Sequence, residues 1–179
     1  MTLWLASGSP RRRQLLEWAG ISVEVHPADV EEVLVAGESP QQSALRLAAL
    51  KAVGPTDRVV LAADTLVHLH GEALGKPVDA ADAIRMLTAL SGGWHQVTTG
   101  VAIRAPGQPL RVFEVTTSVR MRNLPAEEIS RYVATGEPLD KAGAYGIQGV
   151  GGALVAEVQG SWTNVMGLPL EQTLEALRP

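Results

Sequence analysis

The sequence predicts an α/β protein with a mixed β-sheet, and three observations support this class. Expected strands and helices alternate along the chain, as they do in α/β proteins. The continuous apolar run at 59–63 is typical of a strand covered on both faces. The segments 94–104 and 110–122 predict an antiparallel pair, because the second alternates between apolar and polar residues. With 179 residues, 46% of them apolar, the chain can bury a full core, and we expect a single domain over residues 1–179.

Apolar runs bounded by glycine and proline predict the strands in order. The expected strands lie at 2–6, 21–26, 58–63, 94–104, 110–122 and 153–158, with a hairpin over 66–74 that turns near Gly71. Capping residues and glycine stops delimit the helices. The expected helices lie at 10–19, 39–53, 79–90, 125–135 and 170–177.

The helix starts are the best-defined boundaries. Ser9 and Pro10 suit the N-cap and the first helical position. Ser39 and Gln42 form the S-x-x-Q pattern of a capping box. The residues of this second helix that are spaced for one buried face are Leu47, Leu50 and Val53.

Composition and charge exclude several classes of protein. The chain has no cysteine, which excludes disulfides, thiolate metal sites and a cysteine nucleophile. No stretch approaches the roughly 18 apolar residues of a membrane span, and the N-terminus lacks a signal-peptide pattern. The net charge of −4 argues against a general nucleic-acid binder. We therefore expect a cytoplasmic protein that binds neither membranes nor nucleic acids.

Three consecutive arginines, Arg11 to Arg13, occupy the first turn of the first expected helix. Cations are unfavourable at this positive end of the helix dipole unless an anion binds the same free N–H groups. The preceding Ser7-Gly8-Ser9 supplies two hydroxyls and a permissive backbone. The segment is therefore a candidate phosphate site, with a solvated basic turn as the alternative. The chain has neither a Walker A motif nor a dinucleotide-binding glycine motif.

Acidic residues form two candidate positions for metal binding or acid–base chemistry. Asp64 follows the apolar run 59–63, and open α/β sheets place ligand groups at the C-terminal ends of their strands. Such an aspartate can hold a divalent cation or orient a water molecule. Asp29, Glu31 and Glu32 form a second cluster that can supply oxygen ligands to Mg²⁺ or Mn²⁺. For this second cluster a solvated loop is the favoured alternative.

Residues 143–152 carry glycine at five of ten positions. This density suits a backbone that a ligand approaches closely, and a flexible surface loop is the alternative. Gln148 lies among the glycines, and its amide can match the donor–acceptor face of a pyrimidine imide. His68 and His70 have the spacing of a metal pair, but an exposed hairpin face is the favoured interpretation of them.

Taken together, these motifs resemble the Maf-like nucleoside triphosphate pyrophosphatases, in the branch that acts on dTTP and UTP. The segments that carry the resemblance occur in family order and cover nearly the whole chain. They are LASGSPRRRQLL at 5–16, VEE at 30–32, LAALKA at 47–52, LAADT at 61–65, LGKP at 74–77, LDKAGAYGIQG at 139–149 and NVMGLP at 164–169.

The resemblance implies an elongated mixed β-sheet flanked by helices, with two lobes and a central cleft, similar to the inosine-triphosphate pyrophosphatases. It implies hydrolysis of a nucleoside triphosphate to the monophosphate and pyrophosphate, in nucleotide-pool sanitation. A divalent metal cation, Mg²⁺ or Mn²⁺, is the expected cofactor, and a homodimer is the expected assembly. CTP and modified pyrimidine nucleotides are further candidate substrates.

The resemblance also implies a role for each matching residue. Asp64 matches the family's proton acceptor and, with Glu32, is an expected metal ligand. Lys51 and Lys76 are expected to act in catalysis by neutralising the pyrophosphate. The positions that separate the branches of the family are Arg11, Thr65 and Gln148. The expected substrate-binding residues are Ser7, Ser9, Arg11, Arg12, Thr65, Lys141 and Gln148.

The 15 basic residues are twelve arginines and only three lysines, and all three lysines fall in the resembling segments. Lysine is a compact point charge and arginine a wide planar fork, so the two are not interchangeable at a crowded phosphate site. We expect Lys51 and Lys76 to face the triphosphate, and Lys→Arg at either position to impair turnover. For Lys141, a structural role through Asp140 is the alternative.

Two other functions stay open from the sequence. One is a pyrophosphatase for 7-methyl-GTP or another modified nucleotide, since that branch has the same overall pattern with different residues at the specificity positions. The other is a nucleotide-binding regulator of cell division and septum formation, which would act even when the Asp64 chemistry is removed.

Overall fold

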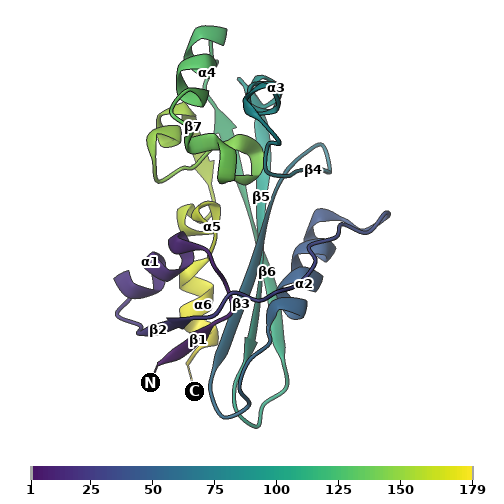
Figure 1. The fold of residues 1–179 in the computed structure, drawn as a ribbon, viewed down its shortest axis with the longest axis vertical. Coiled ribbons are helices and arrows are strands. Elements are labelled where there is room, and N and C mark those ends of the chain that lie inside the picture. Colours follow the sequence, from purple (N-terminus) through teal and green to yellow (C-terminus); the bar gives the residue numbers. More distant parts are fainter. Residues whose placement is uncertain (1, 179) are drawn as a thin grey trace. The chain divides into compact units, whose positions relative to one another are not determined.

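The computed structural model describes residues 2–178, and these form the mixed α/β architecture that was predicted (Figure 1). The strands are β1 Leu3–Leu5, β2 Val23–Val25, β3 Val60–Leu69, β4 Glu72–Leu74, β5 Trp94–Arg104, β6 Arg111–Met121 and β7 Val155–Gln159. The helices are α1 Pro10–Trp18, α2 Pro40–Lys51, α3 Ala80–Leu90, α4 Ala126–Val133, α5 Trp162–Met166 and α6 Leu170–Ala176. Short 3-10 helices occur at η1 Glu137–Asp140, η2 Ala142–Ala144 and η3 Val150–Leu154.

The strands within residues 2–178 form a seven-stranded sheet in the order β2-β1-β3-β5-β6-β7, and β4 pairs with β3. β1 runs parallel to both of its neighbours, with Leu3 opposite Val23 and Trp4 opposite Val60. The pairs β3–β4 and β6–β7 are antiparallel. The sheet is therefore mixed, and the predicted fold class is confirmed.

The chain divides into two compact units, in agreement with the two lobes that were expected. Unit 1 comprises the N-terminal part up to Thr65, Thr98–Val115 and the C-terminal part from Thr163. Unit 2 comprises Leu66–Val97 and Thr116–Trp162. The strands β3, β5 and β6 contribute residues to both units. The expected central cleft stays a prediction.

In unit 1, helix α2 packs on the sheet through small side chains. Ala48 and Ala52 belong to a buried cluster with Val60, Ala62 and Ala102 of the strands. Figure 1 shows α2 on one side of β3, with α1 and α6 on the other side. The sheet of this unit is therefore covered on both faces, as the apolar run at 59–63 predicted.

The predicted buried face of α2 is wrong at two of three positions. Leu47 is buried, but Leu50 is 49% exposed and Val53 is 64% exposed. The face that packs on the sheet consists of Ser43, Ala44, Leu47, Ala48 and Lys51. The bulky apolar residues point outward because the close approach of helix and sheet admits small side chains there.

The approach of α2 to β5 depends on the absence of a side chain at Gly100. A Cβ atom at this position would collide with the carbonyl group of Ala44 and lie 2.8 Å from the amide nitrogen of Leu45. We expect Gly100→Ala to lower the free energy of unfolding by about 1–3 kcal/mol, as overpacking usually does. Urea denaturation measures this change. Gly75→Ala is the matched control, because no atom lies within 4 Å of a Cβ there. Equal stability of the two variants would contradict the predicted clash.

One strand is longer than predicted. The expected strand 58–63 and the first arm of the expected hairpin form the single strand β3, Val60–Leu69. The turn at its end contains His70 with φ 53° and Gly71 with φ 87°, which confirms the predicted turn near Gly71. The prediction that Asp64 ends a strand is therefore wrong. Asp64 and Thr65 continue the extended backbone because their side chains find polar partners on opposite faces of the strand.

The predicted helix starts are confirmed, with one difference. Ser39 and Gln42 form both hydrogen bonds of the capping box, and the Asp79 side chain caps α3 by accepting from the Asp82 amide. Ser9 occupies the N-cap position of α1, but its side chain forms no capping hydrogen bond.

None of the helices formed by residues 2–178 combines the length and the apolar character needed to cross a membrane.

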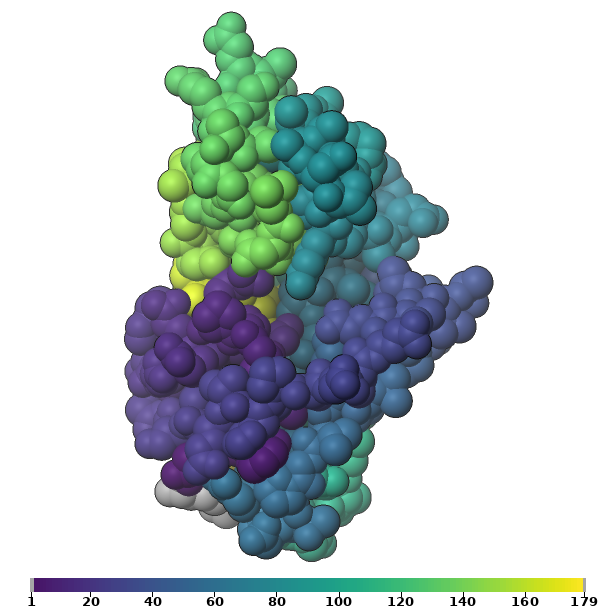
Figure 2. All heavy atoms as spheres, in the orientation of Figure 1, coloured from purple at the N-terminus to yellow at the C-terminus, as the bar shows by residue number. Residues whose placement is uncertain are grey.

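In unit 2, the helices pack against one another. Helix α3 contacts α4, η1 and η2. Figure 2 shows α3, in teal, beside the green segment that contains α4, η1 and η2. Because of this packing, residues of α4 and η1 lie beside the glycine-rich segment 143–152.

Candidate active site

Asp64, Lys51 and Glu32 form a group of charged side chains in unit 1. The Nζ atom of Lys51 lies 2.5 Å from Oδ1 of Asp64 and 2.6 Å from Oε1 of Glu32. Asp64 and Lys51 are 5% and 7% exposed, whereas the Glu32 side chain is 60% exposed. One carboxylate is therefore fixed and buried, and the other stands at the solvent side of the same ammonium group.

The strand and helix that carry this group explain how it forms. Asp64 lies on β3 and Lys51 on the last turn of α2. Successive side chains of a strand point to opposite faces, so Asp64 shares its face with Ala62, which packs against α2. Lysine is rarely buried without a partner, and the two carboxylates compensate the loss of its hydration.

The three charges sum to one negative charge, which favours a cation. Within residues 2–178, no group of three or more His, Asp or Glu side chains is arranged to hold a metal ion. However, protein sites for Mg²⁺ often use only one or two carboxylates and complete the coordination with water and substrate phosphates. Asp64 and Glu32 provide oxygen donors that converge on one cationic group, and these donors fit the predicted metal chemistry.

Arg12 anchors a second polar group in unit 1, on the opposite face of β3. Its Nε donates to the Gly167 carbonyl at 2.8 Å, Nη1 to Oγ of Ser7 at 2.9 Å, and Nη2 to Oγ1 of Thr65 at 3.0 Å. Thr65 also shares a hydrogen bond of 2.9 Å with the Thr99 hydroxyl. Arg12 thereby ties the turn before α1 to β3 and to the loop after α5.

The three arginines of the first turn have different environments. Burial lowers the pKa of Arg12, and the charges of Asp64 and Glu32 partly offset that effect. Arg11 donates Nε to the Met166 carbonyl at 3.2 Å and stays partly exposed. Arg13 is exposed and pairs with Glu17 at 3.4 Å, which matches the alternative of a solvated basic turn. Arg11 is therefore better placed than Arg12 or Arg13 to meet an incoming anion.

The structure divides the predicted site residues between the two units. Unit 1 holds eight of them, namely Ser7, Ser9, Arg11, Arg12, Glu32, Lys51, Asp64 and Thr65. Unit 2 holds the other three, Lys76, Lys141 and Gln148. Lys76 and Gln148 are exposed, and Nζ of Lys141 contacts Oδ1 of Asp140 at 2.6 Å and the Glu137 carbonyl at 2.8 Å. The predicted alternative for Lys141, a contact with Asp140, is therefore present.

The glycine-rich segment is ordered by the protein's own side chains. At Gly149 a Cβ atom would lie 2.5 Å from Oε2 of Glu137, and at Gly151 it would meet the hydroxyl of Tyr132. The prediction that a ligand explains the glycines is therefore wrong at these two positions, because a carboxylate and a phenol occupy the space. The alternative of a flexible loop does not fit either, since Glu137 accepts hydrogen bonds from two of the loop amides.

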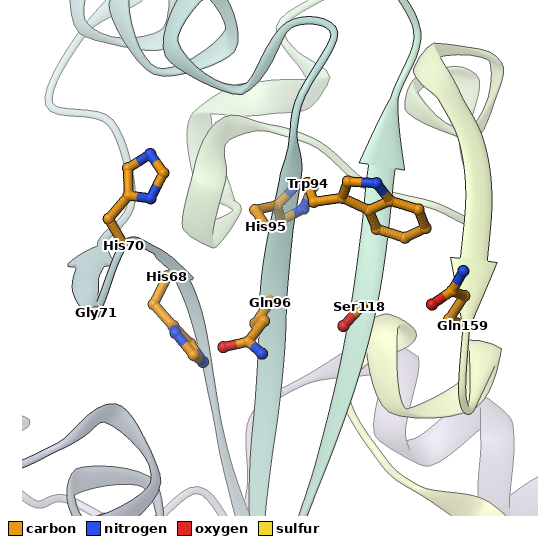
Figure 3. A pocket seen from close by; sticks show the side chains of 8 residues that line it. All are labelled: His68, His70, Gly71, Trp94, His95, Gln96, Ser118 and Gln159. Atoms are coloured by element: carbon orange, nitrogen blue, oxygen red, sulfur yellow. The ribbon is translucent and has the colours of Figure 1, made fainter.

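The histidines of unit 2 border a polar cavity of about 320 Å³ (Figure 3). His68, Gln96, Ser118 and Gln159 form a row across β3, β5, β6 and β7 on its wall. Lys and Arg are missing from its described lining, so it is poorly suited to a triphosphate. The favoured interpretation of His68 and His70 as an exposed pair is wrong for His68, which is 3% exposed. His70 is exposed, as expected, and it belongs to the turn after β3.

His95 also lines this cavity, and its environment keeps it neutral. Burial lowers its pKa to about 4, with a further contribution from His68. Its Nε2 shares a hydrogen bond of 2.7 Å with the Tyr145 hydroxyl. These contacts indicate a structural role for His95.

Sequence reasoning missed several residues that shape the site. Thr99 and the Gly167 carbonyl hold Thr65 and Arg12, and they come from segments distant in sequence. The NVMGLP segment was a sequence signal for Gly167, and Thr99 had none. Tyr132 and Glu137 were also missed, although Glu137 lies just before the conspicuous LDKAGAYGIQG segment.

Comparison with known proteins first defines the class of fold. A solved HAM1 protein from Coxiella burnetii aligns with a TM-score of 0.54 at 17% identity, over 99% of this chain and 98% of that chain. The chain belongs to the family of Maf-like proteins, whose family model matches residues 2–179. Similar relatives include a protein of Anaeromyxobacter sp. (strain Fw109-5), 56% identical over 98% of this chain and 88% of its own length. Another, from Salmonella typhimurium, is 52% identical over 98% of this chain and 91% of its own length. Both relatives are named dTTP/UTP pyrophosphatase.

Proposed function

We propose that this chain is a nucleoside triphosphate pyrophosphatase that hydrolyses dTTP and UTP to the monophosphate and pyrophosphate. The observation that carries the proposal is the buried Asp64 carboxylate held by Lys51, with Glu32 at its solvent side. The names of the relatives, at 52–56% identity over almost the whole chain, support this substrate class.

Hydrolysis requires water to attack the α-phosphorus. A bond forms between the water oxygen and phosphorus, the bond from phosphorus to the bridging oxygen breaks, and pyrophosphate leaves. Asp64 accepts the proton of the attacking water, and Lys51 fixes the position of the carboxylate. The substrate carries about four negative charges, so stabilisation of charge is expected to provide most of the catalysis.

Glu32 and Asp64 are the residues that would hold a divalent cation. When bound, Mg²⁺ or Mn²⁺ would neutralise phosphate oxygens and help to orient them. Lys51 places one positive charge between these two carboxylates, and this arrangement supports a cation-binding role for the pair.

The remaining positions bind phosphate and base in this proposal. Arg11 and Ser9 meet phosphate oxygens at the start of α1. Lys76, which is exposed in unit 2, stays a predicted phosphate ligand. Ser7 and Arg12 keep the turn in shape, since the Ser7 hydroxyl accepts from Arg12 and from the Ser9 amide. Gln148 recognises the pyrimidine through its amide. Thr65 affects specificity through its contact with Arg12. Lys141 as a substrate ligand, a homodimer, a cytoplasmic location and a single functional domain over 1–179 stay predictions.

A panel of triphosphates tests the proposal. With Mg²⁺ present, we expect dTTP and UTP to be hydrolysed with kcat/KM values about 10²-fold above those of ATP and GTP. A site whose polar groups form hydrogen bonds with one base leaves those groups without partners when a different base binds. Pyrophosphate release measures turnover, and the panel includes CTP, modified pyrimidine triphosphates and 7-methyl-GTP. Removal of divalent cations by EDTA is expected to abolish turnover. Preference for 7-methyl-GTP, or no hydrolysis of any member, would contradict the proposal.

A further inference from the structure

A single carboxylate organises the loop around Gln148. Oε1 of Glu137 accepts hydrogen bonds from the Tyr132 hydroxyl at 2.8 Å and from the Gly151 amide at 2.9 Å. Oε2 accepts from the Val150 amide at 3.0 Å. Three donors therefore converge on one side chain, and two of them belong to the backbone just after Gln148.

Tyr132 holds the other side of the same loop. Its hydroxyl accepts a hydrogen bond of 3.2 Å from the Gly146 amide while it donates to Glu137. The side chain comes from α4 and is 3% exposed, so the phenol has a fixed position. Gln148 thus lies between backbone groups that are fixed on both sides, although its own side chain is exposed.

Glu137 also contacts Lys141, the second predicted substrate ligand of this segment. The backbone carbonyl of Glu137 accepts the hydrogen bond from Nζ of Lys141. At Gly146 a Cβ atom would lie 2.6 Å from Cε of Lys141 and 3.4 Å from Nε2 of Gln148. Lys141 and Gln148 are therefore neighbours, and Glu137 contacts the parts of the chain that place both.

We propose that Glu137 and Tyr132 are positioning residues that hold Gln148 in the orientation needed to select the base of the triphosphate. We call Glu137 and Tyr132, with their hydrogen bonds to the loop around Gln148, the clamp. The identity of the base rests on the proposed function, but the existence of the clamp does not. A recognition amide on a fixed backbone loses little conformational freedom on binding, so it discriminates better than one on a mobile loop.

A carboxylate is needed at this position, because an amide cannot accept at both of its terminal atoms. In Glu137→Gln one of the loop amides would face an NH₂ group in place of an oxygen. The pKa of Glu137 agrees with its role: burial alone would raise it, but the hydrogen bonds from Gly151, Tyr132 and Val150 lower it.

Three variants test the clamp. Glu137→Gln removes the charge, and Tyr132→Phe removes one hydroxyl while it keeps the buried ring. Glu157→Gln is the matched control, because this carboxylate in the same unit contacts Arg120 and Gln159 and no loop amide. Hydrogen exchange of the peptide covering 142–152 reports loop order without turnover, and kcat and KM for dTTP, UTP, dGTP and ATP report selectivity.

We expect exchange in the loop to become about 10–100-fold faster in Glu137→Gln, which is the range for a lost hydrogen bond to a charged group. KM for dTTP should rise and the ratio of dTTP to dGTP turnover should fall by a similar factor, with a smaller change in kcat. Tyr132→Phe should show the same pattern more weakly, and Glu157→Gln should match the wild type.

The outcomes separate the clamp from the proposed function. Faster exchange with unchanged selectivity, or unchanged exchange in both clamp variants, would overturn the inference. If Glu137→Gln fails to fold, Tyr132→Phe decides by the same two measurements. If the wild type prefers other triphosphates, the proposed function fails, and the clamp is judged by whether the variants change that preference.

Discussion

Asp64→Asn is expected to lower kcat by about 10²–10⁴-fold, the range for a lost general base, while nucleotide binding is largely retained. Asparagine has nearly the same shape as aspartate, so the packing around β3 is preserved. Lys51 keeps Glu32 as a partner at 2.6 Å and is not left without a counter-charge. Single-turnover release of pyrophosphate measures the chemical step, and calorimetry with a non-hydrolysable dTTP analogue measures binding.

Asp57→Asn is the matched control for this substitution. Asp57 is an exposed aspartate of the same unit, in the loop before β3, and should tolerate the change. Near-normal turnover of Asp64→Asn would refute the role of Asp64 as proton acceptor. If metal-dependent nucleotide binding is lost together with turnover, Asp64 acts mainly as a metal ligand, and Glu32→Gln should show the same loss.

Local signals in the sequence were sufficient for most of the fold. The capping box at Ser39 and the N-cap at Asp79 determine where α2 and α3 begin, because these bonds involve residues three apart in the chain. The turn at His70 and Gly71 was also predicted from a local signal, because Gly71 lies in the turn itself. The short helix α5 was not predicted, since five residues carry little periodicity.

The errors arose where tertiary contacts decide. Leu50 looked like a core residue, but the face of α2 that packs on the sheet consists of Ser43, Ala44, Leu47, Ala48 and Lys51, and Lys51 lies beside Asp64. Asp64 looked like the end of a strand because a charged residue normally leaves a buried sheet. A lysine from another element compensates its charge, and no local pattern reveals such a partner.

Gly149 and Gly151 illustrate the same limit in the candidate site. Their positions suggested a ligand close to the backbone, and close neighbours do exist, but they are Glu137 and Tyr132. A sequence shows that space is needed beside a glycine and cannot show what fills it. The residues of unit 1 that cluster around Asp64 and Arg12 could be selected from motifs, whereas their hydrogen-bond partners in the 163–168 segment required the structure.

Lys51→Arg is expected to reduce kcat by about 10²-fold or more although it preserves the charge, because displacement of a catalytic group by about 1 Å has an effect of this size. Lys51 is 7% exposed, and its Nζ lies between two carboxylates at 2.5 and 2.6 Å. A guanidinium group is wider than an ammonium group, and it would push Asp64 and Glu32 apart. Steady-state and single-turnover rates with dTTP measure the loss.

Lys76→Arg provides the comparison within the same chain. Both substitutions are expected to impair turnover. The structure predicts a smaller loss for Lys76→Arg than for Lys51→Arg, because the exposed Lys76 has room for a wider group. Lys51→Met separates shape from charge: it should also inactivate the enzyme, and its thermal unfolding shows whether the loss comes from the fold. Equal, mild effects of Lys51→Arg and Lys76→Arg would show that only the charge of Lys51 matters and would contradict the role of its compact shape.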